Sequence, residues 1–466
     1  MVGRLLATVF LLFLVFTSAL FAQQADRSGA WAIKGATVID GRGGDPIPDG
    51  IVVVDRGVIR CVGTRDQCPL FGILSIIEGD GLWVMPGLID PEVRMPWSTD
   101  SLGVQDAQNI RLAVGITLVR EAGSVGDVES NIQARERASD PFRPEPRILV
   151  TGAVESKNAR DLGSDGLVEV AQELARRSVD GLLVTGLESG PQLDSIFRVA
   201  RSWAIPVYGG IPNSRLGDEE VFALAERGVR VVQSPEAMGR GDEELIGALV
   251  KNRIAVNPSL TSWQNDGHPE PHLPHLDFLA GPRPVRDLIP FFGSAEARAL
   301  EEARITAGPE YAKAASALKE FRDRGGHVLA GASGSRPGSG LLVELGLLQD
   351  AGIEAPDLVT LATHEAAREL GVDKRFGSVR RGMAADLLLL NADPSVDIRN
   401  TQKVWRVVKG GVIYDPLQLL EPYRLRFKRE TRYAWQRRAG HAKWLLVLLA
   451  GIGGIVWYRR KNAWRL

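Results

Sequence analysis

The hydrophobic and polar positions of the chain change their spacing along its length and divide it into three regions. Near the start, short β-branched runs are separated by Gly, Pro and Asp, which is typical of strands joined by turns. These runs are Trp31–Asp40, Gly50–Asp55 and Val58–Val62. From about residue 84 to 340, short apolar runs alternate with helical stretches, which indicates βα units around a parallel sheet. Strand-like runs then return at Val379–Gly382, Asp386–Leu390 and Val404–Ile413.

Eight strands are predicted in the middle region. They are Leu88–Met95, Ile116–Glu121, Ile148–Gly152, Gly181–Thr185, Pro206–Gly209, Val229–Gln233, Ile254–Asn257 and Val328–Ala332. Eight parallel strands in about 250 residues match the count and size of a TIM barrel, although an open doubly wound sheet fits the same pattern. The predicted fold class is therefore α/β, a (β/α)8 TIM-like barrel, with a small composite β-sandwich domain formed by both ends of the chain.

The first residues have the composition of an export signal. Arg4 precedes an unbroken apolar run, Leu5–Phe16, and Ala22 stands before a polar stretch. This order predicts a signal peptide over residues 1–22. The alternative is an uncleaved N-terminal anchor, because the run is almost long enough to span a bilayer. Both interpretations export the domain to the periplasmic or extracellular side.

A second apolar run, Trp444–Val456, lies near the other end of the chain, with Trp457, Tyr458 and a basic tail behind it. Aromatic and then basic residues at the border predict a transmembrane helix over 444–458 and a cytoplasmic tail over 459–466. The run is short for a span, so a buried or interfacial helix is the alternative. The basic, aromatic-containing segment 416–443 is expected to lie against an anionic membrane surface.

Charge and cysteine content restrict the function further. The formal net charge is −1, which argues against a nucleic-acid-binding protein. The two cysteines of the chain, Cys61 and Cys68, have six residues between them. In an exported domain they are expected to form a local disulfide, and two ordinary thiols are the alternative.

Several segments resemble the amidohydrolase superfamily, in its imidazolonepropionase-like branch. They are ATVIDGRGG (36–44), VMPGLID (84–90), GITLVREAGS (115–124), PRILVTGAVES (146–156), ATHEAARELG (362–371), GSVRRGMAADLLLLNADP (377–394) and VVKGGVIYD (407–415). The resemblance implies a barrel over 84–376 and a composite β-sandwich over 31–83 and 377–415. It also implies relatives that hydrolyse carbon–nitrogen bonds with one or two divalent metals, zinc among them, at the barrel mouth.

The metal ligands that the resemblance implies are replaced in this chain. The His-x-His pair after PGLID is Glu92 and Arg94, and a guanidinium repels a metal ion. The remaining ligand positions fall on Leu183, Gly209 or Gly210, Ser234 and Ser333. No histidine precedes His268, so no shift of the alignment supplies the missing ones. We therefore expect no metal and no other cofactor.

Two other segments contain residues that are typical of catalytic or metal sites. His268, His272 and His275 lie in a Pro-rich segment, 265–277, for which we favour a solvent-exposed loop over a metal site. The segment GASGS (331–335) departs from a nucleophile elbow at its last position, so serine hydrolysis is not favoured.

Polar residues at the predicted strand ends remain as pocket candidates. They are Glu92, Arg94, Arg120, Glu121, Tyr208, Ser234, Asn257 and Ser333. They either line a pocket for a small anionic or zwitterionic ligand, or they form hydrogen bonds and ion pairs only with one another at a closed end of the barrel. The preferred function is a catalytically inactive pseudo-hydrolase with a binding or scaffolding role in the envelope. The alternatives are a divergent active C–N bond hydrolase with a rearranged metal site, and a structural partner in an envelope complex.

Overall fold

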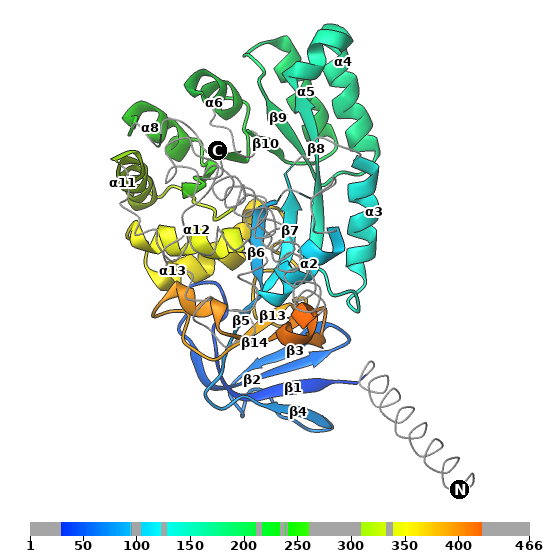
Figure 1. Cartoon of the computed structure of the whole chain (residues 1–466), viewed down its shortest axis with the longest axis vertical. Helices are drawn as coiled ribbons and strands as arrows, with labels where there is room; N and C mark the ends of the chain where they lie inside the picture. The colour runs from blue at the N-terminus through cyan, green and yellow to red at the C-terminus, as the bar shows by residue number, and fades with distance from the viewer. Residues whose placement is uncertain are drawn as a thin grey trace, which may run out of the picture.

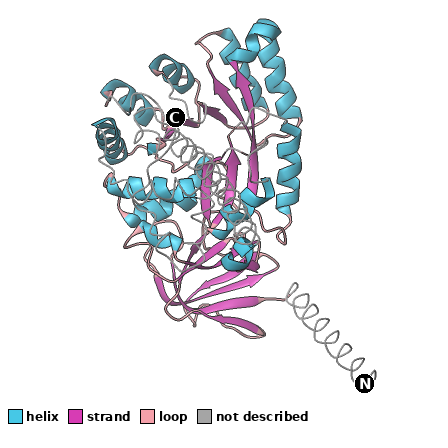
Figure 2. Ribbon diagram, viewed as in Figure 1, coloured by secondary structure: helices cyan, strands magenta, loops and turns pink. Residues whose placement is uncertain are grey.

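The computed structural model describes residues 29–93, 95, 104–122, 128–210, 217–233, 238, 241–260, 309–331 and 339–421. Their strands form two sheets, one at the end of the molecule where the described chain begins and one surrounded by helices (Figures 1 and 2). The two sheets meet where β5 continues into β6 through Gly87.

The first sheet takes strands from both ends of the described chain. Its strands are β1 (Trp31–Val38), β2 (Ile47–Asp55), β3 (Val58–Gly63), β4 (Ser75–Glu78), β5 (Trp83–Pro86), β13 (Leu387–Leu390), β14 (Val404–Lys409) and β15 (Val412–Tyr414). They are ordered β15-β14-β13-β5-β1-β2-β3, with β4 pairing with β1. The strands from the two ends of the described chain are joined by the antiparallel pairing of β5 with β13, in which Pro86 lies opposite Leu387. The division into a separate sandwich domain stays a prediction.

The second sheet is parallel and has the order β12-β11-β10-β9-β8-β7-β6. Its strands are β6 (Leu88–Val93), β7 (Ile116–Glu121), β8 (Arg147–Glu155), β9 (Gly181–Thr185), β10 (Val207–Gly209), β11 (Val231–Gln233) and β12 (Ala255–Asn257). Most of their residues are buried, because helices cover one face and the strands enclose the other. These seven strands confirm the corresponding sequence predictions, with ends that differ by up to three residues.

The eighth predicted strand, Val328–Ala332, needs correction. Only Val328 forms a bridge, parallel to Val256 of β12, and the described part ends at Gly331. A Cβ atom on Gly331 would lie 2.6 Å from Nδ2 of Asn257 in β12 and 2.8 Å from Cβ of Glu92 in β6. The sheet is therefore curled, because its eighth position touches both the last strand and the first.

Helices alternate with the parallel strands, as the βα pattern predicts. They are α2 (Val104–Ala113), α3 (Val128–Ser139), α4 (Ser156–Arg176), α5 (Pro191–Ser202), α6 (Asp218–Ala225), α8 (Glu243–Lys251) and α11 (Pro309–Asp323). A second helical group follows: α12 (Ser339–Asp350), α13 (Ala355–Thr360), η4 (Leu361–Glu365), α14 (Ala366–Glu369) and η5 (Ile398–Gln402).

The inner face of the curled sheet is apolar in its lower part. Its buried cluster contains Ile89, Leu118, Leu183, Tyr208, Val231, Ala255 and Leu329. Ala366, Ala367 and Leu370 belong to the same cluster and close the end of the sheet where the strands begin. A group of buried polar side chains lies toward the opposite end, where the strands finish.

Cys61 and Cys68 form a disulfide, which confirms the local pairing rather than two free thiols. It closes the loop that follows β3 and leads toward β4.

No helix within the described ranges is long and apolar enough to cross a bilayer. The predicted signal peptide and the predicted segment 444–458 lie outside those ranges, so both stay predictions.

Candidate functional site

Buried polar side chains gather at the carboxyl ends of the parallel strands. They are Glu92 of β6, Arg120 and Glu121 of β7, Glu155 of β8, Thr185 of β9, Gln233 of β11 and Asn257 of β12. Thr151 lies deeper, in the middle of β8, opposite Gly181 at the start of β9. Strands that run parallel finish at one edge of a sheet, so these residues are brought together by the topology. Ligand sites of α/β barrels lie at this edge.

Arg120 is the charged centre of this group. Its guanidinium lies over the ring of Tyr208, 4.2 Å from the ring centroid. Nε donates a hydrogen bond to the carbonyl oxygen of Pro91 at 2.7 Å, and Nη1 donates to Oγ1 of Thr151 at 3.3 Å. Three different strands thus hold the guanidinium in one orientation.

The electrostatics of Arg120 follow from its burial. Desolvation lowers its pKa, and Tyr208, Glu92 and Glu121 act in the opposite direction. Burial also raises the pKa of Tyr208 to about 12, against the effect of the Arg120 charge. The phenol therefore stays neutral near pH 7 and offers its ring face to the cation.

Glu92 and Asn257 connect the first strand to the last. Nδ2 of Asn257 donates a hydrogen bond to Oε2 of Glu92, and its Oδ1 accepts one from the backbone N–H of Gly331 at 2.9 Å. The backbone N–H of Glu92 in turn donates to Oδ1 of Asp90 at 3.1 Å. Both ends of the Asn257 amide are engaged, which fixes its orientation and that of the carboxylate.

The structure brings four of the eight predicted pocket residues together: Glu92, Arg120, Tyr208 and Asn257. Glu121 is buried beside them and contributes to the electrostatic stabilisation of Arg120. Arg94, Ser234 and Ser333 lie outside the described residues, so their part in the pocket stays a prediction.

The described residues at these strand ends do not fit a divalent metal. Leu183, at the position that the resemblance gives to a bridging lysine, is packed in the apolar inner cluster. A Cβ on Gly209 would meet the side chain of Leu224, 2.5 Å away, so this position faces a helix. Glu92 is held by an amide and lies near a guanidinium. Within the described ranges, His, Cys, Asp and Glu nowhere gather in threes suited to a metal ion.

His327 lies at the other end of the curled sheet, as its place before the eighth position predicts. Its Nδ1 is 3.2 Å from Oε1 of Glu369, and Nε of Arg230 donates to Oε2 of the same carboxylate at 3.1 Å. Burial tends to raise the pKa of Glu369, but His327, Arg230 and Arg368 outweigh it and hold the pKa below its ordinary value. This cluster joins the strand starts to α14.

Thr151 and Gln233 belong to the buried polar group but were missed as site residues in the sequence. The available signal was a polar residue inside an otherwise apolar strand, as in ILVTG for Thr151. This signal alone does not say which face of the strand the residue occupies.

No protein-family model matches the chain. Imidazolonepropionase from Idiomarina loihiensis is 30% identical over 107 residues, which are 23% of this chain and 25% of that protein. Imidazolonepropionase from a Caulobacter species is 32% identical over 106 residues, which are 22% of this chain and 25% of that protein. The chain thus matches a quarter of the length of these curated relatives.

Solved structures are similar over most of the chain. A Xaa-Pro dipeptidase with bound methionine superposes with a TM-score of 0.62 at 17% sequence identity. The aligned region covers 83% of this chain and 100% of the dipeptidase chain. Phenylurea hydrolase B superposes with a TM-score of 0.63 at 19% sequence identity. The aligned region covers 83% of this chain and 97% of the hydrolase chain. At these identities the likeness establishes the fold.

In its fold, and over part of its sequence, the chain is similar to the amidohydrolase superfamily. The sequence similarity is to imidazolonepropionase, over the quarter of that enzyme just described.

Proposed function

We propose that the chain is an exported, membrane-tethered pseudo-hydrolase that binds a small anionic or zwitterionic ligand at the strand ends and does not hydrolyse it. One observation carries the proposal. Glu92, at a position that the resemblance gives to a metal ligand, is hydrogen-bonded to Asn257 and lies close enough to Arg120 to affect its pKa.

The composition of this group supports binding rather than metal-assisted hydrolysis. A fixed guanidinium provides a positive charge for an anionic group, and a carboxylate provides a negative charge for an ammonium group. A divalent metal at the same place would lie beside the Arg120 charge, which opposes its binding. The apolar cluster below the polar group gives a ligand a closed floor.

Export is supported by two independent features. A disulfide joins Cys61 and Cys68, and such bonds persist mainly in oxidising compartments outside the cytosol. The apolar runs Leu5–Phe16 and Trp444–Val456 supply a route for export and an anchor.

The test uses the full chain purified from zinc-supplemented medium. Metal content, hydrolysis of dipeptides and N-acyl amino acids, and calorimetric binding of the same compounds are measured on one preparation. We expect no stoichiometric zinc or manganese, no turnover, and saturable binding of at least one compound. Stoichiometric metal together with turnover would instead establish the divergent C–N hydrolase.

Two variants and a control locate the binding site. Glu92→Gln keeps the size of the side chain and removes its charge, so we expect about tenfold weaker binding of a zwitterion, which is ~1.4 kcal/mol. Arg120→Met is expected to abolish binding of an anionic group. The control, Arg324→Met, removes an exposed arginine away from the site. This variant should bind the ligand with the same affinity as the unchanged protein. Equal affinity in all three variants would contradict the assignment.

A further inference from the structure

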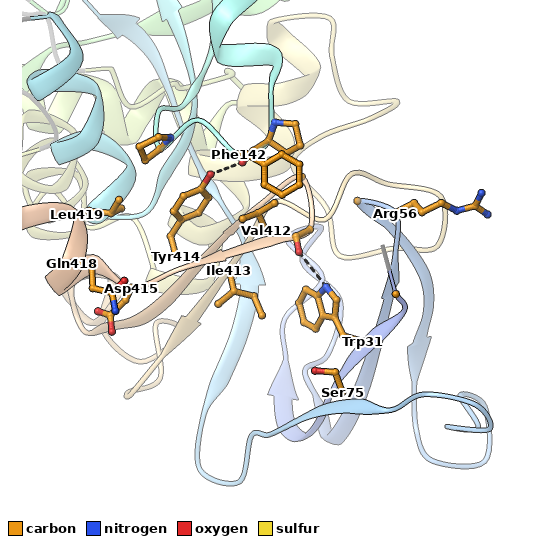
Figure 3. Close-up of a pocket in the computed structure, with 16 residues that line it drawn as sticks. Trp31, Arg56, Ser75, Phe142, Val412, Ile413, Tyr414, Asp415, Gln418 and Leu419 are labelled. Atoms are coloured by element: carbon orange, nitrogen blue, oxygen red, sulfur yellow. Dashed lines mark hydrogen bonds between the residues drawn. The ribbon is translucent and has the colours of Figure 1, made fainter. Parts of the chain in front are cut away.

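A hollow of about 620 Å³ opens beside the first sheet, away from the strand ends (Figure 3). Its walls come from β1, from the loop after α3 and from β15, and include Trp31, Phe142 and Tyr414. Trp31 Nε1 donates to the carbonyl oxygen of Gly411 at 3.1 Å, and the hydroxyl of Tyr414 donates to that of Pro141. The walls are therefore fixed by contacts between elements far apart in the sequence.

Nine large apolar side chains are exposed in the described part, and two of them, Phe142 and Ile413, line this hollow. Leu74 and Leu417 are adjacent in sequence to the lining residues Ser75 and Gln418, and Phe71 lies in the same loop as Leu74. We call these five the apolar rim: Phe71, Leu74, Phe142, Ile413 and Leu417. Phe71 and Leu74 are 92% and 97% exposed. Leu74 precedes Ser75, a hollow-lining residue that pairs with Trp31, so the loop that carries Phe71 and Leu74 ends at the hollow.

That loop is restrained where it begins. Cys68 is buried and bonded to Cys61, and Leu70 and Ile73 pack on the adjacent apolar cluster. Phe71 and Leu74 are thus presented outward on a loop whose other apolar residues face inward. Exposed apolar side chains that are held in this way favour an interaction site.

Both directions of the chain leave the described structure at this hollow. Gly29, the first described residue, and Leu419, close to the last, both line it. Leu5–Phe16 and Trp444–Val456 are joined to these points by chain that spans at most roughly 47 Å and 90 Å when fully extended. Any bilayer that holds either apolar run is therefore within reach of the apolar rim.

We propose that the apolar rim is the face of the protein that contacts an anionic phospholipid bilayer. This inference rests on the proposed membrane tether. The aromatic residues Trp31, Phe142 and Tyr414 are of the kinds that favour the headgroup boundary. The charged side chains that line the hollow are Arg56, which is mostly exposed, and Asp415, whose carboxylate is 3.3 Å from Arg406. The basic residues of 424–443 add positive charge to the same end of the chain.

This orientation directs the strand ends away from the lipid. The parallel strands begin beside the first sheet, where Arg147 at the start of β8 pairs with Asp386, and run away from it (Figure 1). With the apolar rim on the bilayer, the strand ends that carry Glu92 and Arg120 point toward the aqueous side.

The test attaches an environment-sensitive fluorophore to single cysteines in the full chain, since the disulfide leaves no native thiol to label in the described part. The positions are Phe71→Cys, Phe142→Cys and Leu417→Cys. The controls are Trp203→Cys and Val396→Cys, which replace exposed apolar residues elsewhere; these are 50% and 74% exposed, within the range of the three test positions. The chain is reconstituted in phosphatidylcholine–phosphatidylglycerol vesicles that carry a nitroxide-labelled lipid.

We expect several-fold stronger quenching at the three apolar-rim positions than at the two controls. If the chain floats with the vesicles but the apolar-rim labels are quenched no more than the controls, the proposed face is wrong and the tether stands. If all five labels are quenched alike, there is no preferred face and the inference fails. If the chain does not float with vesicles at all, the tether and the inference are both overturned.

Discussion

The side chain of Lys409 is fully buried at the contact between the first sheet and the loop after α3. Its Nζ donates hydrogen bonds to the carbonyl oxygens of Ala138, Asp140 and Arg143 at 2.7, 2.9 and 3.2 Å. Burial, together with the nearby Arg147 charge, lowers the pKa of Lys409 to about 8, although Asp386 and Glu145 act against this shift. One amine thus binds a carbonyl group in the last turn of α3, Ala138, and two in the loop that follows, Asp140 and Arg143.

The buried amine predicts a pH dependence of stability. In the unfolded chain Lys409 has its ordinary pKa of 10.5, so between pH 8 and that value the unfolded chain binds more protons than the folded one. The free energy of unfolding contributed by this group therefore rises with pH across the window. Lys409→Met should lose that rise and also lower stability at pH 7 by about 2–4 kcal/mol, because the three hydrogen bonds of the amine are lost.

Urea unfolding of the unchanged protein and of Lys409→Met at pH 7 and pH 10 measures both effects. Lys319→Met removes an exposed lysine that is paired with Asp323 at 2.6 Å, and it should change stability by less than about 0.5 kcal/mol at either pH. A difference between Lys409→Met and the unchanged protein that stays constant with pH would refute the lowered pKa.

At the scale of elements, the eighth position of the curled sheet depends on a glycine. The space beside Gly331 is filled by Asn257 and Glu92, with no room for a Cβ atom. Gly331→Ala should therefore separate the last strand from the first and cost about 1–3 kcal/mol of stability by overpacking. Because it displaces Glu92, the variant should also weaken ligand binding at the strand ends.

Thermal unfolding and calorimetric binding of Gly331→Ala check this expectation. Gly217→Ala is the matched control, because nothing lies within 4 Å of the added Cβ and the backbone φ of −69° suits alanine. Equal melting temperatures for the two variants would show that the eighth position tolerates a side chain.

The disulfide belongs to a single connection, the loop after β3. Closing so short a loop restricts the unfolded chain, and the loop-entropy account gives about 2–3 kcal/mol. Cys61→Ala/Cys68→Ala should lose this amount, and reductant should lower the melting temperature of the unchanged protein to that of the double variant. Asp66→Ala, in the same loop, should melt as the unchanged protein does. A melting temperature unaffected by reductant would contradict the prediction.

Much of the element order was predictable from sequence, because a parallel strand buried on both faces has an apolar run of characteristic length. The site was predictable in part: Glu92, Arg120, Tyr208 and Asn257 lie at strand ends, and parallel strands bring such ends together. The hydrogen bond between Asn257 and Glu92 was not predictable, because it depends on the curvature that brings the last of the seven strands next to the first. Lys409 gave no signal either, since its partners are more than 260 residues away.

At the scale of the whole molecule, Arg147 and Asp386 join the two sheets. Nε and Nη2 of Arg147 donate to the two carboxylate oxygens at 2.8 and 3.2 Å, and both side chains are largely buried. Arg147→Ala should lower the free energy of unfolding by about 3–5 kcal/mol, because it leaves a buried carboxylate without its partner.

A double-mutant cycle with Asp386→Asn measures the coupling of the pair. We expect the double variant to be less destabilised than the sum of the two single variants by at least about 1 kcal/mol. The exposed pair Arg324–Glu320, treated in the same way, should show coupling below about 0.5 kcal/mol. Additive effects at Arg147 and Asp386 would show that the two sheets are held by other contacts.

The pairing of β5 with β13 also affects the solubility of the nascent chain during its synthesis. While the ribosome is still extending the polypeptide, Trp83–Pro86 is a bare apolar edge, since its partner Leu387–Leu390 is synthesised roughly 300 residues later. Every nascent chain shorter than that keeps this edge open to aggregation or to a chaperone. Termination before Leu387 should therefore yield insoluble or rapidly degraded fragments, even when all seven parallel strands are present.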